Sequence, residues 1–240
     1  MEFLRGVRAL LFDLDGTLVD TAPDITAAVD ATLRTLERAP IESATVRSYI
    51  GRGVDTLLHR VLTGEREGNA ALDLHDRARD VFFREYGAHN GRTAEAYPGV
   101  RDGLAHARRL GLSMACVTNK LQHFSDDLLA QLGLDGYFEF VIGGDALPQR
   151  KPDPEPLLHA AALLGVEPAE CLMIGDSSND AMAARAAGMP IVLLPYGYTE
   201  DQPIESIDCD AVVASIALVV AALDPANSGT VASRTASTCA

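Results

Sequence analysis

The chain has 240 residues, of which 48% are hydrophobic and 22% charged, a composition typical of one sizeable globular domain or of a domain with an insertion. Its formal net charge of −14 argues against nucleic acid as a partner, since that affinity comes mainly from Lys and Arg on phosphates, and it makes anionic membrane surfaces poor partners. If the substrate is an anion, positive charge close to the site must overcome this overall field.

The first predicted strand, Val7–Phe12, ends in two acidic residues. Asp13 and Asp15 are two positions apart, so an extended chain would direct both side chains to one side. Ligands of parallel α/β sheets bind at the carboxyl ends of the strands. A buried carboxylate is costly unless something neutralises it, which indicates a site. Taken alone, Asp15-Gly16 could also be an ordinary turn.

A helical block of about 75 residues follows this strand. Apolar residues at helical spacing predict four helices, at Asp24–Glu37, Ser43–Tyr49, Val54–Leu62 and Leu72–Tyr86. The block contains no convincing strand and is too long for a crossover connection. It therefore predicts an inserted helical domain over residues 19–93, joined by short linkers near Thr17–Asp20 and Gly91–Tyr97.

The rest of the chain alternates strands with helices. Further apolar runs predict buried strands at Leu112–Val117, Phe138–Ile142, Cys171–Ile174, Ile191–Leu194 and Ala211–Val213. Amphipathic stretches predict helices at Asp102–Leu110, Phe124–Leu132, Pro154–Leu164 and Asn179–Ala187. This alternation predicts an α/β core with a parallel sheet, built from residues 1–18 and 94–224. Residues 225–240 are small and polar, and they predict a disordered tail.

Three of the predicted strands are followed by polar residues. Thr118, Asn119 and Lys120 follow one strand, and Asp176 and Asp180 follow another. Thr118 or Asp176 alone would more simply be a helix cap or a loop acid. The repetition at three strands favours one polar site at a single edge of the sheet.

Lysine is rare in this chain. Of 20 basic residues only two are lysines, Lys120 and Lys151. A loop lysine such as Lys151, just before Pro152, is normally solvated. In a chain that otherwise uses Arg, however, it indicates a place where a compact point charge is needed among carboxylates and a phosphate.

The four acids predict a metal. If Asp13, Asp15, Asp176 and Asp180 converge, carboxylates about 5 Å apart repel by roughly 3 kcal/mol per pair at an effective dielectric near 20, which one lysine cannot offset. Oxygen ligands without nearby His or Cys select a hard cation, so Mg²⁺ is expected; the six histidines have no zinc-ligand spacing. An Asp carboxylate can attack phosphorus, cations can neutralise the phosphoryl oxygens, and a second acid can protonate the leaving oxygen. Nucleotide-driven chemistry is disfavoured, because the chain contains no GxxxxGK[ST] motif.

The motifs "DLDGT", "VTN", "KPDP" and "GDSSND", in this order between Val7 and about Leu223, resemble those of the haloacid dehalogenase superfamily of phosphatases. Within it, "FDLDGTLVDTAPD", "YIGRGVDTLL" and "YGY" are similar to the phosphoglycolate phosphatase group. The resemblance implies a Rossmann-like core with the first strand central and helices on both faces. It also implies that the helical insertion is a C1-type cap.

The resemblance further implies roles for individual residues. Asp13 would be the nucleophile and Asp15 the general acid and base, while Thr118, Asn119 and Lys151 would bind the phosphoryl group. Mg²⁺ would be held by Asp13, the backbone carbonyl of Asp15, and Asp176, with Asp180 supporting the metal shell. Arg52, between two glycines of the cap, could contact the substrate or could be a solvated loop arginine.

The expected reaction is Mg²⁺-dependent hydrolysis of a small phosphomonoester such as 2-phosphoglycolate through an aspartyl-phosphate. The same chemistry on a sugar phosphate or a phosphorylated biosynthetic intermediate stays open, as does a phosphomutase, because the cap sets specificity and matches less well. A dehalogenase needs no metal and lacks the second acid, so Asp15, Asp176 and Asp180 argue against it. A catalytically silent binding protein is disfavoured because every expected catalytic position is present.

Cysteine usage and the N-terminus predict a cytoplasmic location. The four cysteines form no CxxC pair, and the N-terminus lacks an apolar secretory segment. The longest apolar stretch, Ala211–Leu223, is too short to span a bilayer. The expected partner is a small phosphorylated metabolite, and the expected assembly is a monomer or a homodimer.

Overall fold

The core is built on a parallel sheet. A computed structural model describes residues 2–227, and within them a six-stranded sheet has the order β5-β4-β1-β6-β7-β8, with every neighbouring pair parallel. The strands are β1 (Ala9–Phe12), β4 (Ser113–Val117), β5 (Val141–Ile142), β6 (Cys171–Gly175), β7 (Ile191–Leu193) and β8 (Ala211–Val212). Each lies in a predicted apolar run, with β6 one residue longer. The central position of β1, between β4 and β6, is confirmed.

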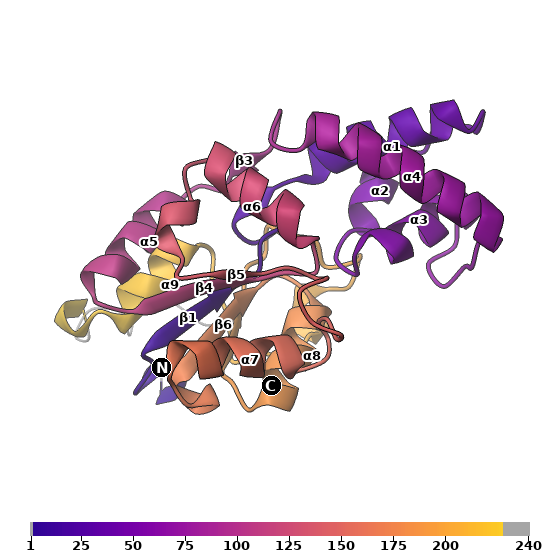
Figure 1. Ribbon diagram of the computed structural model, residues 1–240. Coiled ribbons are helices and arrows are strands. Elements are labelled where there is room, and N and C mark those ends of the chain that lie inside the picture. The colour runs from indigo at the N-terminus through magenta and orange to yellow at the C-terminus, as the bar shows by residue number, and fades with distance from the viewer. Residues whose placement is uncertain (1, 228–240) are drawn as a thin grey trace.

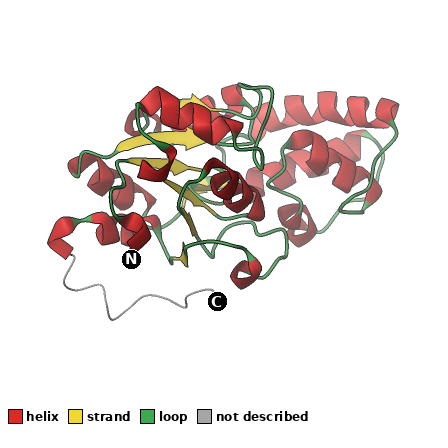
Figure 2. Cartoon of the chain, turned by 90° about the horizontal axis from the view of Figure 1, so that it is seen from below, coloured by secondary structure: helices red, strands yellow, loops and turns green. Residues whose placement is uncertain are grey.

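Helices cover both faces of the sheet (Figures 1 and 2). They are α5 (Val100–Arg109), α6 (Gln122–Gln131), α7 (Glu155–Leu164), α8 (Ser178–Ala187) and α9 (Ile216–Leu223). Because successive strand residues point to opposite faces, Leu10 and Phe12 of β1 pack with α5, α6 and α9, whereas Ala9 and Leu11 pack with α7 and α8. Burial on both faces explains why these strands are continuous apolar runs, and the predicted α/β class is confirmed.

The insertion between β1 and β4 is the helical cap (Figure 1). Its helices are α1 (Ala22–Thr35), α2 (Ser43–Ser48), α3 (Val54–Thr63) and α4 (Leu72–His89). They share an apolar cluster in which Val29, Leu58 and Phe82 are buried, and Phe124 and Tyr198 of the core pack into it. Each helix begins and ends within three residues of its prediction. The domain boundaries at residues 19 and 93 remain a prediction.

The two linkers to the cap pair with each other. Strand β2 (Val19–Asp20) pairs antiparallel with β3 (Glu95–Ala96), so the expectation of no strand from residue 19 to 93 is wrong at its first two residues. A strand this short has no detectable periodicity in the sequence. Asp24, buried near the start of α1, accepts hydrogen bonds from three backbone N–H groups of residues 91–94 and fixes the second linker.

A buried ion pair joins the cap to the loop after β7. Arg60 of α3, which is 1% exposed, donates from Nη2 to Oε2 of Glu200 at 3.0 Å. Its other donors contact the backbone carbonyls of Arg66 and Tyr49. Arg52, whose side chain is 39% exposed, donates to Oε1 of Glu200 at 3.1 Å. One buried and one partly exposed arginine of the cap thus share a single carboxylate of the core.

Replacing Arg60 with Met is expected to lower the free energy of unfolding by about 2–3 kcal/mol, since it leaves the buried Glu200 carboxylate with only partly exposed arginine partners and removes the donor to the buried Tyr49 carbonyl. The matched Arg52→Met variant should cost less than about 1 kcal/mol, because the Arg52 side chain is 39% exposed and Glu200 keeps its buried bond to Arg60. Urea unfolding followed by circular dichroism compares the two. Equal losses of unfolding free energy in the two variants would show that burial does not strengthen the contribution of the Arg60 pair.

The remaining described segments are short. Single 3-10 turns occupy η1 (Glu2–Leu4), η2 (Asp135–Tyr137), η3 (Pro168–Glu170), η4 (Ile204–Ser206) and η5 (Pro225–Asn227). The predicted disordered tail, residues 225–240, lies outside the described residues after Asn227. Among the helices of residues 2–227, none is both long enough and apolar enough to cross a membrane.

Candidate active site

The polar residues predicted at three strand ends lie at one edge of the sheet. Asp13 follows β1, Thr118 follows β4 and Asp176 follows β6, and these three strands are neighbours. A cavity of about 50 Å³ lies between this edge and the cap. The core lines it with Asp13, Asp15, Thr118, Asn119 and Lys120, and the cap lines it with residues that include Ile25, Ile50, Val54, Leu57 and Phe82. Asp13 and Asp15 therefore face the same space, as their spacing predicts.

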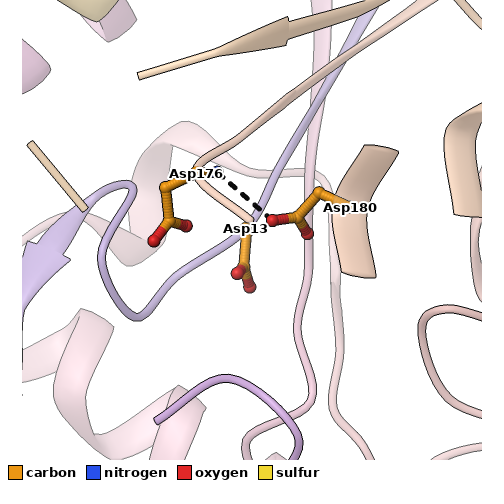
Figure 3. Close-up of side chains that lie close together, drawn as sticks. All are labelled: Asp13, Asp176 and Asp180. Atoms are coloured by element: carbon orange, nitrogen blue, oxygen red, sulfur yellow. Dashed lines mark hydrogen bonds between the residues drawn. The ribbon is translucent and has the colours of Figure 1, made fainter. Parts of the chain in front are cut away.

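Three aspartates form a compact acidic cluster (Figure 3). Asp13, Asp176 and Asp180 each place a carboxylate oxygen within 4.8 Å of the others. Asp180 Oδ2 accepts hydrogen bonds from the backbone N–H groups of Asp176 and Ser177, at 3.2 and 3.1 Å. The Thr17 hydroxyl donates to Asp176 Oδ1 at 2.7 Å. Local hydrogen bonds thus orient the two buried acids toward Asp13.

The chain closes tightly around Asp176. A Cβ atom on Gly16 would lie 2.3 Å from Asp176 Oδ2, and one on Gly197 would lie 2.2 Å from Asp176 Cβ. Gly16 also has a φ of +87°, in the left-handed region. Glycine is therefore required at both positions for the backbone to approach this carboxylate.

Lys151 neutralises part of the cluster, as the sequence predicts. Its Nζ lies 2.9 Å from Asp13 Oδ1 and 2.8 Å from Asp180 Oδ1, and it donates to the Val117 carbonyl at 2.6 Å. These contacts use all three ammonium donors. Lys151 is absent from the described cavity lining, and a phosphoryl contact would have to replace one of these bonds.

Lys120 is a site residue to which the sequence analysis assigned no role. Its Nζ lies 3.2 Å from Asp15 Oδ1 and donates to the hydroxyl of Tyr86 on α4. The rarity of lysine in this chain was the signal that could have identified Lys120, since both lysines of the chain lie at this site. Four carboxylates and two ammonium groups therefore leave two negative charges uncompensated.

Burial, together with the surplus of negative charge, raises the pKa values of two of the acids. Burial raises the pKa of Asp13 to about 7 despite the opposing charge of Lys151, and Asp180 adds to the increase. Burial and the charges of Asp180 and Asp13 raise the pKa of Asp176 well above its usual value. Although burial opposes it, the carboxylates of Asp13 and Asp180 raise the pKa of Lys151. Burial and the repulsion between neighbouring carboxylates therefore both oppose the ionised forms of Asp13 and Asp176.

The donor set fits one divalent cation. Its ligand atoms are carboxylate oxygens, which hard cations prefer, and a charge of +2 would neutralise the site. Asp13 Oδ2 accepts no hydrogen bond from the described residues, whereas Oδ1 accepts from the Leu14 N–H and Lys151. The side chain of Asp15 lies outside the acidic cluster and pairs with Lys120 instead.

The remaining candidates differ in what they offer to a ligand. Thr118 lines the cavity. The side-chain amide of Asn119 donates to the backbone carbonyls of Gly51 and Lys151, at 3.0 and 2.8 Å, so it bridges cap and core. Any phosphoryl contact of Asn119 would therefore use its backbone N–H. Arg52 contacts Glu200 and is absent from the described lining, so its contact with substrate remains a prediction.

Comparisons with known proteins agree with the motifs. The family model of haloacid dehalogenase-like hydrolases matches residues 7–188. Proteins named phosphoglycolate phosphatase from Nitrosospira multiformis and Thiobacillus denitrificans are 45% and 46% identical over 216 residues, which cover 90% of this chain and 95% of each relative. The crystal structure of a predicted phosphoglycolate phosphatase from Haemophilus somnus has a TM-score of 0.86 and 30% identity, and covers 91% of this chain and 99% of that one. The chain thus belongs to the haloacid dehalogenase-like hydrolase family, which its four motifs predicted.

Proposed function

We propose that this protein is a Mg²⁺-dependent phosphatase that hydrolyses a small phosphomonoester, with 2-phosphoglycolate as the first candidate, through an aspartyl-phosphate on Asp13. The observation that carries the proposal is the pair of carboxylates, Asp13 and Asp15, that line one cavity at the rim of the sheet. Asp13 alone of the two belongs to the acidic cluster and contacts Lys151. This asymmetry supports different roles for the two acids, nucleophile for Asp13 and general acid and base for Asp15.

In the first step, a carboxylate oxygen of Asp13 attacks phosphorus and the bond to the ester oxygen breaks. Asp15, in its protonated form, gives its proton to the leaving oxygen, so the alcohol departs neutral. Thr118 and Asn119 line the cavity, and in this proposal the Thr118 hydroxyl and the Asn119 backbone N–H donate to the phosphoryl oxygens. The enzyme then carries the phosphoryl group on Asp13.

In the second step, Asp15 is a carboxylate and acts as a base. It takes a proton from a water molecule, which attacks phosphorus as the bond to Asp13 breaks. Inorganic phosphate leaves, Asp13 is again a carboxylate, and Asp15 is again protonated. Lys120, 3.2 Å from Asp15 Oδ1, holds this carboxyl group in place through both steps.

Asp13, the backbone carbonyl of Asp15, and Asp176 would hold the Mg²⁺ ion, with Asp180 supporting them through its bonds to Ser177 and Lys151. When bound, the ion neutralises charge on the acids and on the phosphoryl oxygens. Lys151 supplies the remaining positive charge beside Asp13.

The cap favours a small substrate without many hydroxyl groups. Its wall of the cavity is largely apolar, with Ile25, Val54, Leu57 and Phe82 among the lining residues. A sugar phosphate would place several hydroxyls against these side chains, where they would lose their hydrogen bonds to water. The relatives' name, phosphoglycolate phosphatase, agrees with a two-carbon substrate.

A phosphate-release screen with Mg²⁺ tests the function. The panel contains 2-phosphoglycolate, phosphorylated sugars, phosphorylated three-carbon acids and a hexose 1-phosphate, whose products are also checked for isomerisation. We expect 2-phosphoglycolate to have the highest kcat/KM. A sugar phosphate whose kcat/KM is tenfold higher would replace 2-phosphoglycolate as the proposed substrate. Isomerisation of the hexose 1-phosphate would indicate a phosphomutase. If no ester releases phosphate, the proposed phosphatase activity is refuted.

The cytoplasm remains the proposed location. Cys116 and Cys171 are buried free thiols, which suits a reducing compartment, while Cys239 lies outside the described residues. The expected assembly, a monomer or a homodimer, remains a prediction.

A further inference from the structure

The lining of the cavity combines one positively charged side chain with an apolar wall. Among the described residues that line it, Lys120 is the only one with a positive charge, since Lys151, which pairs with Asp13 and Asp180, and Arg52, which pairs with Glu200, are not part of the lining. The cap wall offers no charged side chain to the same space in the described residues. If the proposed Mg²⁺ ion serves the phosphoryl group, a second anionic group of the substrate finds its cationic side chain in Lys120, because a charge left against apolar side chains is strongly unfavourable.

Lys120 is held rigidly. Its side chain is 5% exposed, and Nζ contacts Asp15 and the Tyr86 hydroxyl. The Tyr86 ring is fixed in turn by stacking on Phe82 at 5.4 Å and by an edge contact with Phe124 at 4.9 Å. An ammonium group has three donors, and these contacts use two. One donor is left for a ligand in the cavity that Lys120 lines.

The position of Lys120 matches the shape of a 2-phosphorylated acid. Asp15 must reach the ester oxygen to protonate it, and Lys120 Nζ lies 3.2 Å from Asp15 Oδ1. In such a substrate the carboxylate oxygens lie only about 3–4 Å from the ester oxygen, from standard bond lengths. A substrate whose ester oxygen meets Asp15 therefore brings its carboxylate within reach of Lys120.

We propose that Lys120 is the specificity-determining residue of this enzyme, and that it selects phosphorylated 2-hydroxy acids by binding their carboxylate. The proposal rests on the proposed phosphatase function and assigns its substrate class to one side chain. Lys120 then has two partners of the same kind, the Asp15 carboxyl group and the substrate carboxylate. A neutral ester of the same length would leave one donor of the buried ammonium group without an acceptor. The lost hydrogen bond lowers kcat/KM for the neutral ester relative to the acid.

The test compares two esters that differ in one group. 2-Phosphoglycolate and 2-hydroxyethyl phosphate share the phosphoryl group and the chain length, but only the first carries a carboxylate. In the Lys120→Met variant, kcat/KM for the acid should fall roughly 100-fold more than kcat/KM for the neutral ester, since truncating one partner of a buried charge pair has effects of this size. Lys120→Gln, which keeps a donor, is the second variant if Lys120→Met does not fold by circular dichroism.

A binding measurement separates selection from chemistry. In an Asp13→Asn background, calorimetry should show that Lys120→Met weakens binding of 2-phosphoglycolate roughly 100-fold while binding of 2-hydroxyethyl phosphate changes little. Equal losses for both esters, in turnover and in binding, would show that Lys120 only positions Asp15 and would overturn the proposal. Failure of the unmodified enzyme to hydrolyse either ester would instead refute the phosphatase function, so the two failures are distinguishable.

Discussion

The Asp13→Asn variant is expected to lose phosphatase turnover by at least about four orders of magnitude while keeping its fold, as is usual when a nucleophile is removed. The amide has the shape of the carboxylate but is a poor nucleophile towards phosphorus. The fold should survive because Lys151 keeps its bonds to Asp180 and to the Val117 carbonyl. Phosphate release and circular dichroism, measured on the same preparation, check both parts.

Asp127→Asn is the matched control, since Asp127 is exposed on α6 and lies in the same core. We expect its turnover to equal that of the unmodified enzyme. If Asp13→Asn also retains near-normal turnover, Asp13 is not the nucleophile. Loss of the circular dichroism signal in Asp13→Asn alone would assign a structural role to this carboxylate.

Removal of divalent cations with EDTA is expected to reduce turnover to background, and excess Mg²⁺ should restore it. Two negative charges of the site are uncompensated by Lys120 and Lys151, and a phosphomonoester dianion would add two more. Without a cation, the substrate would enter a strongly repulsive site. Phosphate release before and after chelation measures this effect.

Mg²⁺ should also stabilise the folded protein without substrate, because the acidic cluster exists only when Asp13 and Asp176 are brought together. A melting temperature that rises with Mg²⁺, and that does not rise in an Asp176→Asn variant, would locate the ion. In the EDTA experiment described above, full turnover in the presence of the chelator would show that the reaction requires no divalent cation.

Much of the core could be predicted from the sequence, because its strands are buried on both faces. Ala9–Phe12 is apolar at every position, and its neighbours in the sheet have the same pattern. The two-residue strands Val19–Asp20 and Glu95–Ala96 could not be found, since their pairing depends on where the cap returns to the core. Local sequence contains no signal for such a contact.

Of the four acids expected to converge, the structure brings Asp13, Asp176 and Asp180 together, whereas Asp15 pairs with Lys120. Asp13, Asp176 and Asp180 follow strands whose ends meet by topology, so their approach follows from the fold. The contact of Lys120 with Tyr86 depends on the docking of α4, a cap helix, and no motif links the two residues. Arg60 and Glu200, 140 residues apart, were missed for the same reason. The relatives and the family match agree with the phosphatase that the motifs predicted.

Trapping the phosphorylated enzyme tests the nucleophilic role of Asp13 most directly. An Asp15→Asn variant cannot activate water, but it can still react with p-nitrophenyl phosphate, whose leaving group needs no acid. After rapid mixing with Mg²⁺ and an acid quench, peptide mapping by mass spectrometry should find one phosphoryl group, on the carboxylate of Asp13. Release of nitrophenol with no phosphorylated peptide, or with the phosphoryl group on another side chain, would contradict the account.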